Sequence, residues 1–188
     1  DVIKEEYGFK IYPIIQSCAK VIASMKVNRI GVFATQATVN SGAYKKELMK
    51  YNSALEVCEL ACPDWVPIVE SGNYDNPKSI AAVEMHVEEM LKFAPDKIIL
   101  GCTHYPLLRS TIRKIMGEEV RLVNPAYETA LELRKLLTDK DLVSDETVEE
   151  EFPYRFYVSD LAEKFKDFAN SILPYNVEKT QKIDIEKY

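Results

Sequence analysis

The chain has 188 residues, of which 47% are hydrophobic and 29% are charged, a balance typical of a globular protein and not of a collagen-like or low-complexity one. Its 24 Lys and Arg residues against 30 Asp and Glu residues give a formal charge of −6, which disfavours a nucleic-acid partner. No apolar run approaches the roughly 20 residues of a membrane-spanning helix, so we expect no membrane partner either.

The cysteine content indicates a reducing compartment. Four cysteines are too few for a disulfide scaffold in a chain of this length. No basic segment followed by an apolar one, as in a secretory signal, stands at the start of the sequence. We therefore expect a cytoplasmic protein with free thiols.

Short apolar segments alternate with helical patterns along the chain, which predicts an α/β fold with a parallel sheet flanked by helices. The predicted strands are residues 29–35, 66–70, 97–101, 120–123 and 154–158. The predicted helices are residues 77–93, 106–116 and about 127–137, and one more that begins at Asp160. Glu163, three residues after Asp160, completes a capping-box pattern.

The helix predicted for residues 77–93 has the clearest pattern. Asn76 is placed to cap it and Pro77 stands in its first turn. One apolar face contains Ile80, Val83, Val87, Met90 and Leu91. His86 falls beside that face, so we expect a solvated surface histidine without a functional role.

Two later segments are predicted to lie at the surface. Residues 138–152 are polar and acidic, which indicates a solvated loop more than a metal site. Residues 174–188 have no amphipathic period, so we expect a C-terminal surface extension.

The segment KIILGCTHYPLLRSTIRKIM, residues 97–116, carries the most chemical information. A buried strand is predicted to end at Gly101, and ligands bind at the carboxyl ends of strands in open α/β sheets. There Cys102 would face the positive end of the next helix, which stabilises a thiolate. His104 is placed to tune that thiol or to contact a substrate. The Thr103 hydroxyl and nearby backbone N–H groups are suited to a carboxylate.

Three other interpretations of Cys102 remain open. A buried structural cysteine is the usual role of this residue type. Cys58 and Cys62 would have to join Cys102 and His104 in a zinc site, but their spacing does not match common zinc modules, and we expect no metal. A Cys–His hydrolase normally takes its base from a distant part of the chain, not from the second residue on.

Two further clusters accompany this segment. Thr35 and Thr38 follow a predicted strand, where their hydroxyls either bind a polar ligand group or cap the next helix. Glu70 ends another predicted buried strand, where a carboxylate needs a partner and therefore either forms a salt bridge or tunes a site. Local sequence does not separate these alternatives.

Three segments together resemble the glutamate racemases of the aspartate/glutamate racemase superfamily. GCTHYP at residues 101–106 matches that family's second active-site motif. ATQATVNSGAY at residues 34–44 and CPDWVPIVESG at residues 62–72 occur in the family's order and at matching spacing. The resemblance extends from the start of the chain to about Leu173.

The resemblance implies a racemase that needs no cofactor and uses two cysteines, one on each face of the substrate α-carbon. Cys102 would act on L-glutamate, His104 would assist it and contact the substrate, and Glu70 would orient His104. By the same resemblance, Thr103, Thr35 and Thr38 would bind the polar groups of the substrate. The implied role is the supply of D-glutamate for bacterial peptidoglycan, and the resemblance allows a homodimer.

The chain also departs from the family pattern. The family begins with the motifs D-S-G and P-Y-G, followed by an A-C-N-T segment that carries the first catalytic cysteine. None of these motifs occurs in this sequence, and Cys18 lacks the Asn-Thr context. We expect about a third of a normal family chain to be absent. Residues 16–125 would form one complete racemase domain, and residues 1–15 and 126–173 a remnant of the other.

These departures lead us to expect that the 188-residue chain alone binds glutamate poorly and does not racemise it. Two alternatives stand beside this prediction. One is a racemase of the same superfamily that acts on aspartate or another amino acid, although Tyr-Pro after GCTH favours glutamate. The other is a non-catalytic fragment that binds a ligand or a protein partner.

Overall fold

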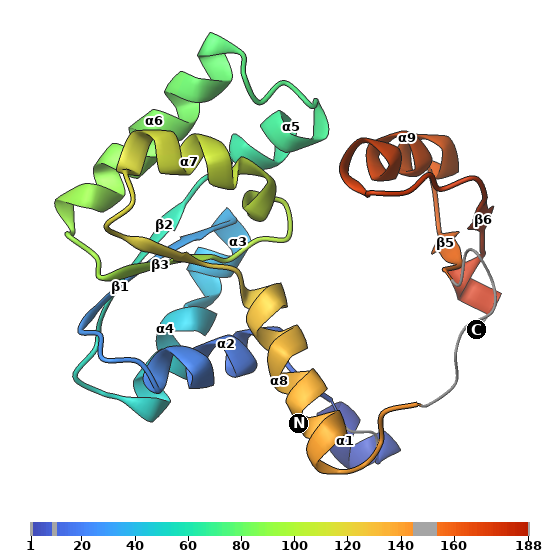
Figure 1. The fold of residues 1–188 in the computed structure, drawn as a ribbon, viewed down its shortest axis with the longest axis horizontal. Coiled ribbons are helices and arrows are strands. Elements are labelled where there is room, and N and C mark those ends of the chain that lie inside the picture. The colour runs from blue at the N-terminus through green and yellow to red at the C-terminus, as the bar shows by residue number, and fades with distance from the viewer. Residues whose placement is uncertain (1, 9–10, 145–153, 188) are drawn as a thin grey trace. The chain divides into compact units, whose positions relative to one another are not determined.

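A computed structural model describes residues 2–8, 11–144 and 154–187. The chain divides into two compact units, Asp1–Val143 and Ser144–Tyr188. The first unit is built on a four-stranded sheet in the order β2-β1-β3-β4 (Figure 1). All neighbouring strands of this sheet run parallel, as the alternating sequence pattern predicts.

The strands of this sheet are short. They comprise β1 (Arg29–Ala34), β2 (Glu56–Ala61), β3 (Lys97–Leu100) and β4 (Arg121–Val123). The central strands β1 and β3 are almost fully buried, as expected for parallel strands covered on both faces.

Helices cover both faces of the sheet (Figure 1). One face is covered by α2 (Ile14–Ala23), α4 (Ala43–Tyr51) and α8 (Pro125–Asp139). The other is covered by α5 (Trp65–Glu70), α6 (Pro77–Lys92) and α7 (Arg109–Met116). Three further short elements are α1 (Val2–Tyr7), α3 (Gln36–Ser41) and the 3₁₀ turn η1 (Tyr105–Leu108).

Alternation along β1 sends its side chains into two separate cores. Ile30, Val32 and Ala34 pack with residues of α2 and α4 on one side. Phe33 points to the other side, where its ring centroid lies 4.7 Å from that of Trp65. Trp65 also meets the Tyr105 ring edge-on, with the centroids 4.9 Å apart. This aromatic group joins α5 to the segment that follows β3.

One predicted strand is wrong. Residues 66–70 lie in helix α5, and the missing strand is β2 at Glu56–Ala61. A short apolar run such as VPIVE fits a buried helix turn as well as a strand, and Pro67 is tolerated within the first turn. Strand β2 lies at the edge of the sheet and contains the charged residues Glu56 and Glu59. These residues interrupt the apolar run by which a buried strand is recognised in a sequence.

The helix predicted at residues 77–93 is confirmed as α6, and the Asn76 side chain accepts a hydrogen bond from the Lys78 N–H at 2.9 Å. The prediction for His86 is wrong, because this residue is only 8% exposed. His86 follows Val83 by three residues and therefore shares the buried face of α6. Its Nδ1 lies 2.9 Å from the Ala82 carbonyl oxygen, and its ring meets Trp65 edge-on.

The second unit contains β5 (Phe156–Val158), α9 (Ala162–Ile172), β6 (Thr180–Lys182) and the 3₁₀ turn η2 (Ile185–Lys187). Strands β5 and β6 pair in parallel. Most of the predicted loop at residues 138–152 lies outside the described residues.

In the second unit one prediction is wrong and another is incomplete. The capping box fails because Leu161 precedes α9 in a left-handed conformation, while the Asp160 carboxylate pairs with Lys182 at 3.0 Å. Residues 174–188 are more than a surface extension, since they supply β6 and the buried Val177. Long-range strand pairing of this kind leaves no local pattern in a sequence. Within the described ranges, no helix has the length and apolar character needed to cross a bilayer.

Candidate active site

The carboxyl edge of the four-stranded sheet gathers most of the predicted site residues. Phe33 of β1 is in register with Leu100 of β3, so Thr35 and Cys102 both follow their strands by the same offset. The chain leaves β1 for one side of the sheet and β3 for the other. Sheets of this order bind ligands in the crevice where the strand order reverses, which here is between β1 and β3.

A tight turn places Cys102 at this point. The Gly101 N–H donates to the Phe33 carbonyl at 2.7 Å, and the Tyr105 N–H donates to the Cys102 carbonyl at 3.2 Å. The predicted helix at residues 106–116 begins differently, with the single 3₁₀ turn η1 before α7 starts at Arg109. The thiol is therefore followed by a short 3₁₀ turn and does not face the first turn of a regular helix.

Cys102, His104 and Glu70 form a chain of polar contacts. The Cys102 Sγ lies 3.8 Å from His104 Nδ1, within hydrogen-bonding range for sulfur. His104 Nε2 lies 3.5 Å from Glu70 Oε1, and the Thr103 Oγ1 lies 3.4 Å from His104 Nδ1. The imidazole thus stands between a thiol and a carboxylate, an arrangement suited to holding and relaying a proton.

The structural position of Glu70 differs from the one predicted from the sequence. It is the last residue of helix α5 and not the end of a buried strand, and 64% of its side chain is exposed. The expected cost of a buried carboxylate therefore does not arise. Solvent screening makes the attraction between Glu70 and His104 modest.

Thr35 and Thr38 contact each other through their side chains. Their Oγ atoms are 2.9 Å apart, and the Thr35 Oγ1 accepts the Thr38 N–H at 3.3 Å as the N-cap of α3. The capping role considered for Thr35 is therefore present in the structure. Thr35 also lies beside the start of the Cys102 turn, because β1 and β3 are neighbours.

The other cysteines have different surroundings. Cys18 on α2 and Cys62 after β2 are both fully buried. Burial, helped by Glu128, raises the pKa of the Cys18 thiol to about 12, and burial also raises the pKa of the Cys62 thiol. Cys58 is half-buried within β2, and burial raises its pKa as well. None of these three thiols is ionised near neutral pH.

The zinc alternative has no counterpart in the part of the chain that the structure describes. There, His, Cys, Asp and Glu side chains do not gather in any group of three or more that could hold a metal. The described contacts at the Cys102 turn join a thiol, an imidazole and an exposed carboxylate.

Two residues beside Cys102 were not singled out from the sequence. Tyr44 and Asn124 line a small cavity of about 80 Å³ together with Gly101, Cys102 and Thr103. Asn124 also caps α8, because its Oδ1 accepts the Ala126 N–H at 3.1 Å. The same Asn-Pro pair occurs at residues 76–77 and at residues 124–125, so the cap of α8 could have been predicted from the sequence as the cap of α6 was.

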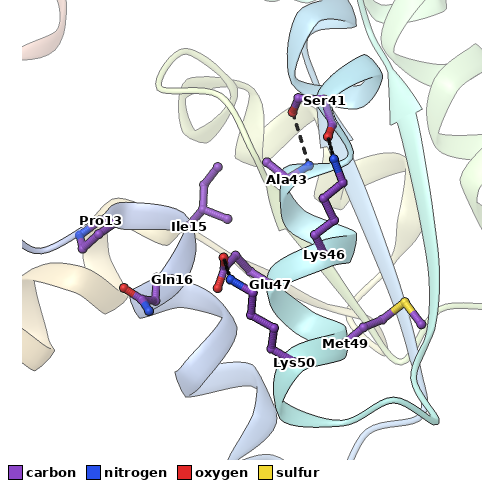
Figure 2. A pocket seen from close by; sticks show the side chains of 9 residues that line it. All are labelled: Pro13, Ile15, Gln16, Ser41, Ala43, Lys46, Glu47, Met49 and Lys50. Atoms are coloured by element: carbon purple, nitrogen blue, oxygen red, sulfur yellow. Dashed lines mark hydrogen bonds and ion pairs between the residues drawn. The ribbon is translucent and has the colours of Figure 1, made fainter. Parts of the chain in front are cut away.

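A larger groove lies elsewhere on the first unit. It has a volume of about 830 Å³ and runs between the start of α2 and helix α4 (Figure 2). An ion pair between Glu47 and Lys50 lies in it. None of the predicted site residues lines this groove, so the small cavity at Cys102 is the one associated with the motif.

Comparison with known proteins points to one family. The model of the Asp/Glu/hydantoin racemase family matches residues 3–132. The glutamate racemase of Thermoanaerobacter sp. (strain X514) is 34% identical over 186 residues, which cover 98% of this chain and 69% of that protein.

Solved structures agree with this result. Glutamate racemase RacE1 of Bacillus anthracis is 31% identical, with a TM-score of 0.87 over 98% of this chain and 68% of that one. The Francisella tularensis glutamate racemase in complex with D-glutamate is 26% identical, with a TM-score of 0.86 over 100% of this chain and 69% of that one. The chain thus spans about two thirds of the length of these relatives. It belongs to the Asp/Glu/hydantoin racemase family and, within that family, to the glutamate racemases.

Proposed function

We propose that this chain provides one half of the active site of a glutamate racemase that needs no cofactor, with Cys102 as the group that acts on L-glutamate. One observation carries the proposal. The Cys102 Sγ lies 3.8 Å from His104 Nδ1, in a turn at the carboxyl ends of β1 and β3. The D-glutamate complex of the Francisella tularensis relative supports the choice of substrate.

In the proposed reaction the Cys102 thiolate removes the α-proton of L-glutamate. The C–H bond breaks, an S–H bond forms, and the electron pair remains on the α-carbon, where the adjacent carboxylate group delocalises it. A second thiol on the opposite face then donates a proton to that carbon, which inverts its configuration. Two groups are needed because a single base returns its proton to the face from which it came.

The neighbouring residues receive supporting roles. His104 assists Cys102 through the contact between Nδ1 and Sγ, and Glu70 orients the imidazole through its contact with Nε2. The hydroxyls of Thr103, Thr35 and Thr38 bind the amino and carboxylate groups of the substrate. In this proposal D-glutamate serves peptidoglycan synthesis, and the cytoplasmic location and the homodimer remain predictions.

The second thiol does not come from the other three cysteines of the sequence. Cys18 and Cys62 are fully buried with raised pKa values, and Cys58 lies in the middle of an edge strand. The family's A-C-N-T segment does not occur in these 188 residues. We therefore propose that the chain alone removes the α-proton without inverting the substrate.

The test is α-proton exchange of L-glutamate in D₂O, followed by proton NMR, with chiral chromatography to detect D-glutamate. Exchange without inversion is expected at high glutamate concentration, and it disappears in Cys102→Ala. The matched control is Cys58→Ala, which removes a half-buried thiol away from the turn and leaves the exchange unchanged. Exchange that persists in a folded Cys102→Ala chain contradicts the role of Cys102, and substantial D-glutamate production contradicts the half-site.

A further inference from the structure

The segment that carries Cys102 is held between strand β1 and helix α4. On one side, the Gly101 N–H donates to the Phe33 carbonyl oxygen at 2.7 Å. On the other side lies the ring of Tyr44, the second residue of α4, which is only 3% exposed. The backbone immediately before the thiol is therefore fixed by contacts from two different elements.

The Tyr44 ring occupies the space that a side chain at position 101 would need. A Cβ built on Gly101 would lie 2.9 Å from Tyr44 Cε2 and 2.9 Å from the Phe33 carbonyl oxygen. The ring edge therefore rests directly against the Gly101 backbone, in space that any other residue type would fill. A glycine at this position allows the strand, the turn and the ring to meet.

Gly42 places the ring there. This glycine has a φ of 60°, in the left-handed region, where it ends α3 and leads directly into α4. Its carbonyl accepts the Lys46 N–H at 2.9 Å, so α4 starts immediately and its first turn lies near the carboxyl edge of the sheet. Glycine tolerates this conformation without the steric cost that a Cβ brings.

Tyr44 also shares surroundings with the thiol. Its ring lines the 80 Å³ cavity together with Cys102 and Thr103. Burial, followed by electrostatic interaction with Cys18 and Cys102, raises the pKa of the phenol, so the side chain stays neutral. An uncharged, rigid ring beside the thiol is suited to support and not to proton transfer.

We propose that Tyr44 is a positioning residue for Cys102. Its ring packs against Gly101, and this contact fixes the turn that holds the Cys102 Sγ within hydrogen-bonding range of His104 Nδ1. The ring acts through the backbone, so the phenol hydroxyl is not required. The inference rests on the proposed function only in taking Cys102 as the reacting thiol.

The experiment measures how fast iodoacetamide alkylates Cys102 in the 188-residue chain, with the labelled peptide quantified by mass spectrometry. It needs neither glutamate nor a second cysteine, so its outcome is independent of whether the chain racemises. Tyr44→Leu removes the ring, Tyr44→Phe retains it, and Leu48→Ala is the control. Leu48 is fully buried one helical turn further along α4, in the same core as Tyr44, and it is absent from the cavity lining.

Tyr44→Leu is expected to slow alkylation of Cys102 roughly fivefold, the factor that corresponds to the loss of one hydrogen bond of ordinary strength. It should also shift the backbone amide resonances of Cys102 and Thr103. Tyr44→Phe is expected to restore the wild-type rate, and Leu48→Ala to leave it unchanged although it destabilises the fold. If Tyr44→Leu unfolds at the assay temperature, Tyr44→Met provides the same test with more of the volume filled.

An unchanged alkylation rate in a folded Tyr44→Leu or Tyr44→Met chain overturns the proposal. So does an equal decrease in Leu48→Ala, because it would show a general effect of a loosened core. A decrease in Tyr44→Phe as large as that in Tyr44→Leu would place the effect in the hydroxyl and also contradict the role given to the ring.

Discussion

Replacement of Trp65 by alanine tests the aromatic group that joins α5 to the active-site turn. Trp65 is fully buried, and its ring centroid lies 4.7 Å from Phe33, 4.9 Å from Tyr105 and 5.8 Å from His86. Truncation of a buried aromatic residue costs about 3–5 kcal/mol. We expect a loss in the upper part of that range, because aromatic pairs add about 0.5–1.5 kcal/mol beyond their buried area.

The Trp65 indole N–H contributes little to this figure. Its Nε1 is buried and has no hydrogen-bond partner within the described ranges. The matched variant is therefore Trp65→Phe, which keeps an aromatic ring and removes the unsatisfied donor. We expect Trp65→Phe to cost clearly less than Trp65→Ala, because an aromatic ring remains in the core and the cavity is smaller.

The assay is urea unfolding at constant pH, followed by far-UV circular dichroism. Trp65 is the only tryptophan of the sequence, so fluorescence cannot be compared between the variants. With a slope of about 2 kcal/mol per molar urea, the expected loss in Trp65→Ala moves the midpoint by roughly 2 M. A midpoint shift below about 0.5 M would refute the claim that this group holds α5 against the turn.

Three further predictions concern residues outside this group. Asp96→Asn should reduce stability at pH 7 but much less near pH 3, as urea midpoints measured at both pH values will show. Hydrogen bonds from the Asn28 and Arg29 N–H groups lower the pKa of the Asp96 carboxyl below 3.8. The stability that the carboxylate contributes is therefore present above pH 3.8 and is lost as the pH falls through the lowered pKa. Asn76→Ala should lower the free energy of unfolding in urea by about 1 kcal/mol, because the α6 cap is lost. Asn76→Asp should retain most of the stabilisation that the cap provides. Gly101→Ala should lower the melting temperature, since its Cβ would lie 2.9 Å from the Phe33 carbonyl oxygen; an unchanged melting curve would contradict the tight packing at this turn.

Much of the first unit could be predicted from local pattern. The buried strands β1 and β3 are continuous apolar runs, and α6 carries both a cap and an apolar face. The edge strand β2 was not predicted because half-buried strands keep charged residues. Helix α5 was predicted as a strand because a run of five residues is too short to define a period. His86 was predicted to lie beside the apolar face of α6, but it belongs to the buried face.

The candidate site was predictable where chemistry and position coincide in one segment. Cys102, Thr103 and His104 stand together after a buried strand, and the structure brings Glu70 to His104 although it comes from a helix end. Tyr44 was not found because a buried tyrosine carries the same pattern as a core residue. Its position beside Gly101 depends on where the first turn of α4 lies relative to the end of β3, which no local signal specifies.

The role of Cys102 as one of two bases can be tested by supplying the family motif that these 188 residues do not contain. A racemase segment that carries the family's A-C-N-T motif would be fused ahead of residue 1, and D-glutamate formation from L-glutamate would be followed by chiral chromatography. We predict that the folded fusion forms D-glutamate, that Cys102→Ala abolishes this activity, and that Cys58→Ala retains it. A folded fusion whose D-glutamate formation survives Cys102→Ala would contradict the assignment of Cys102 as one of the two bases.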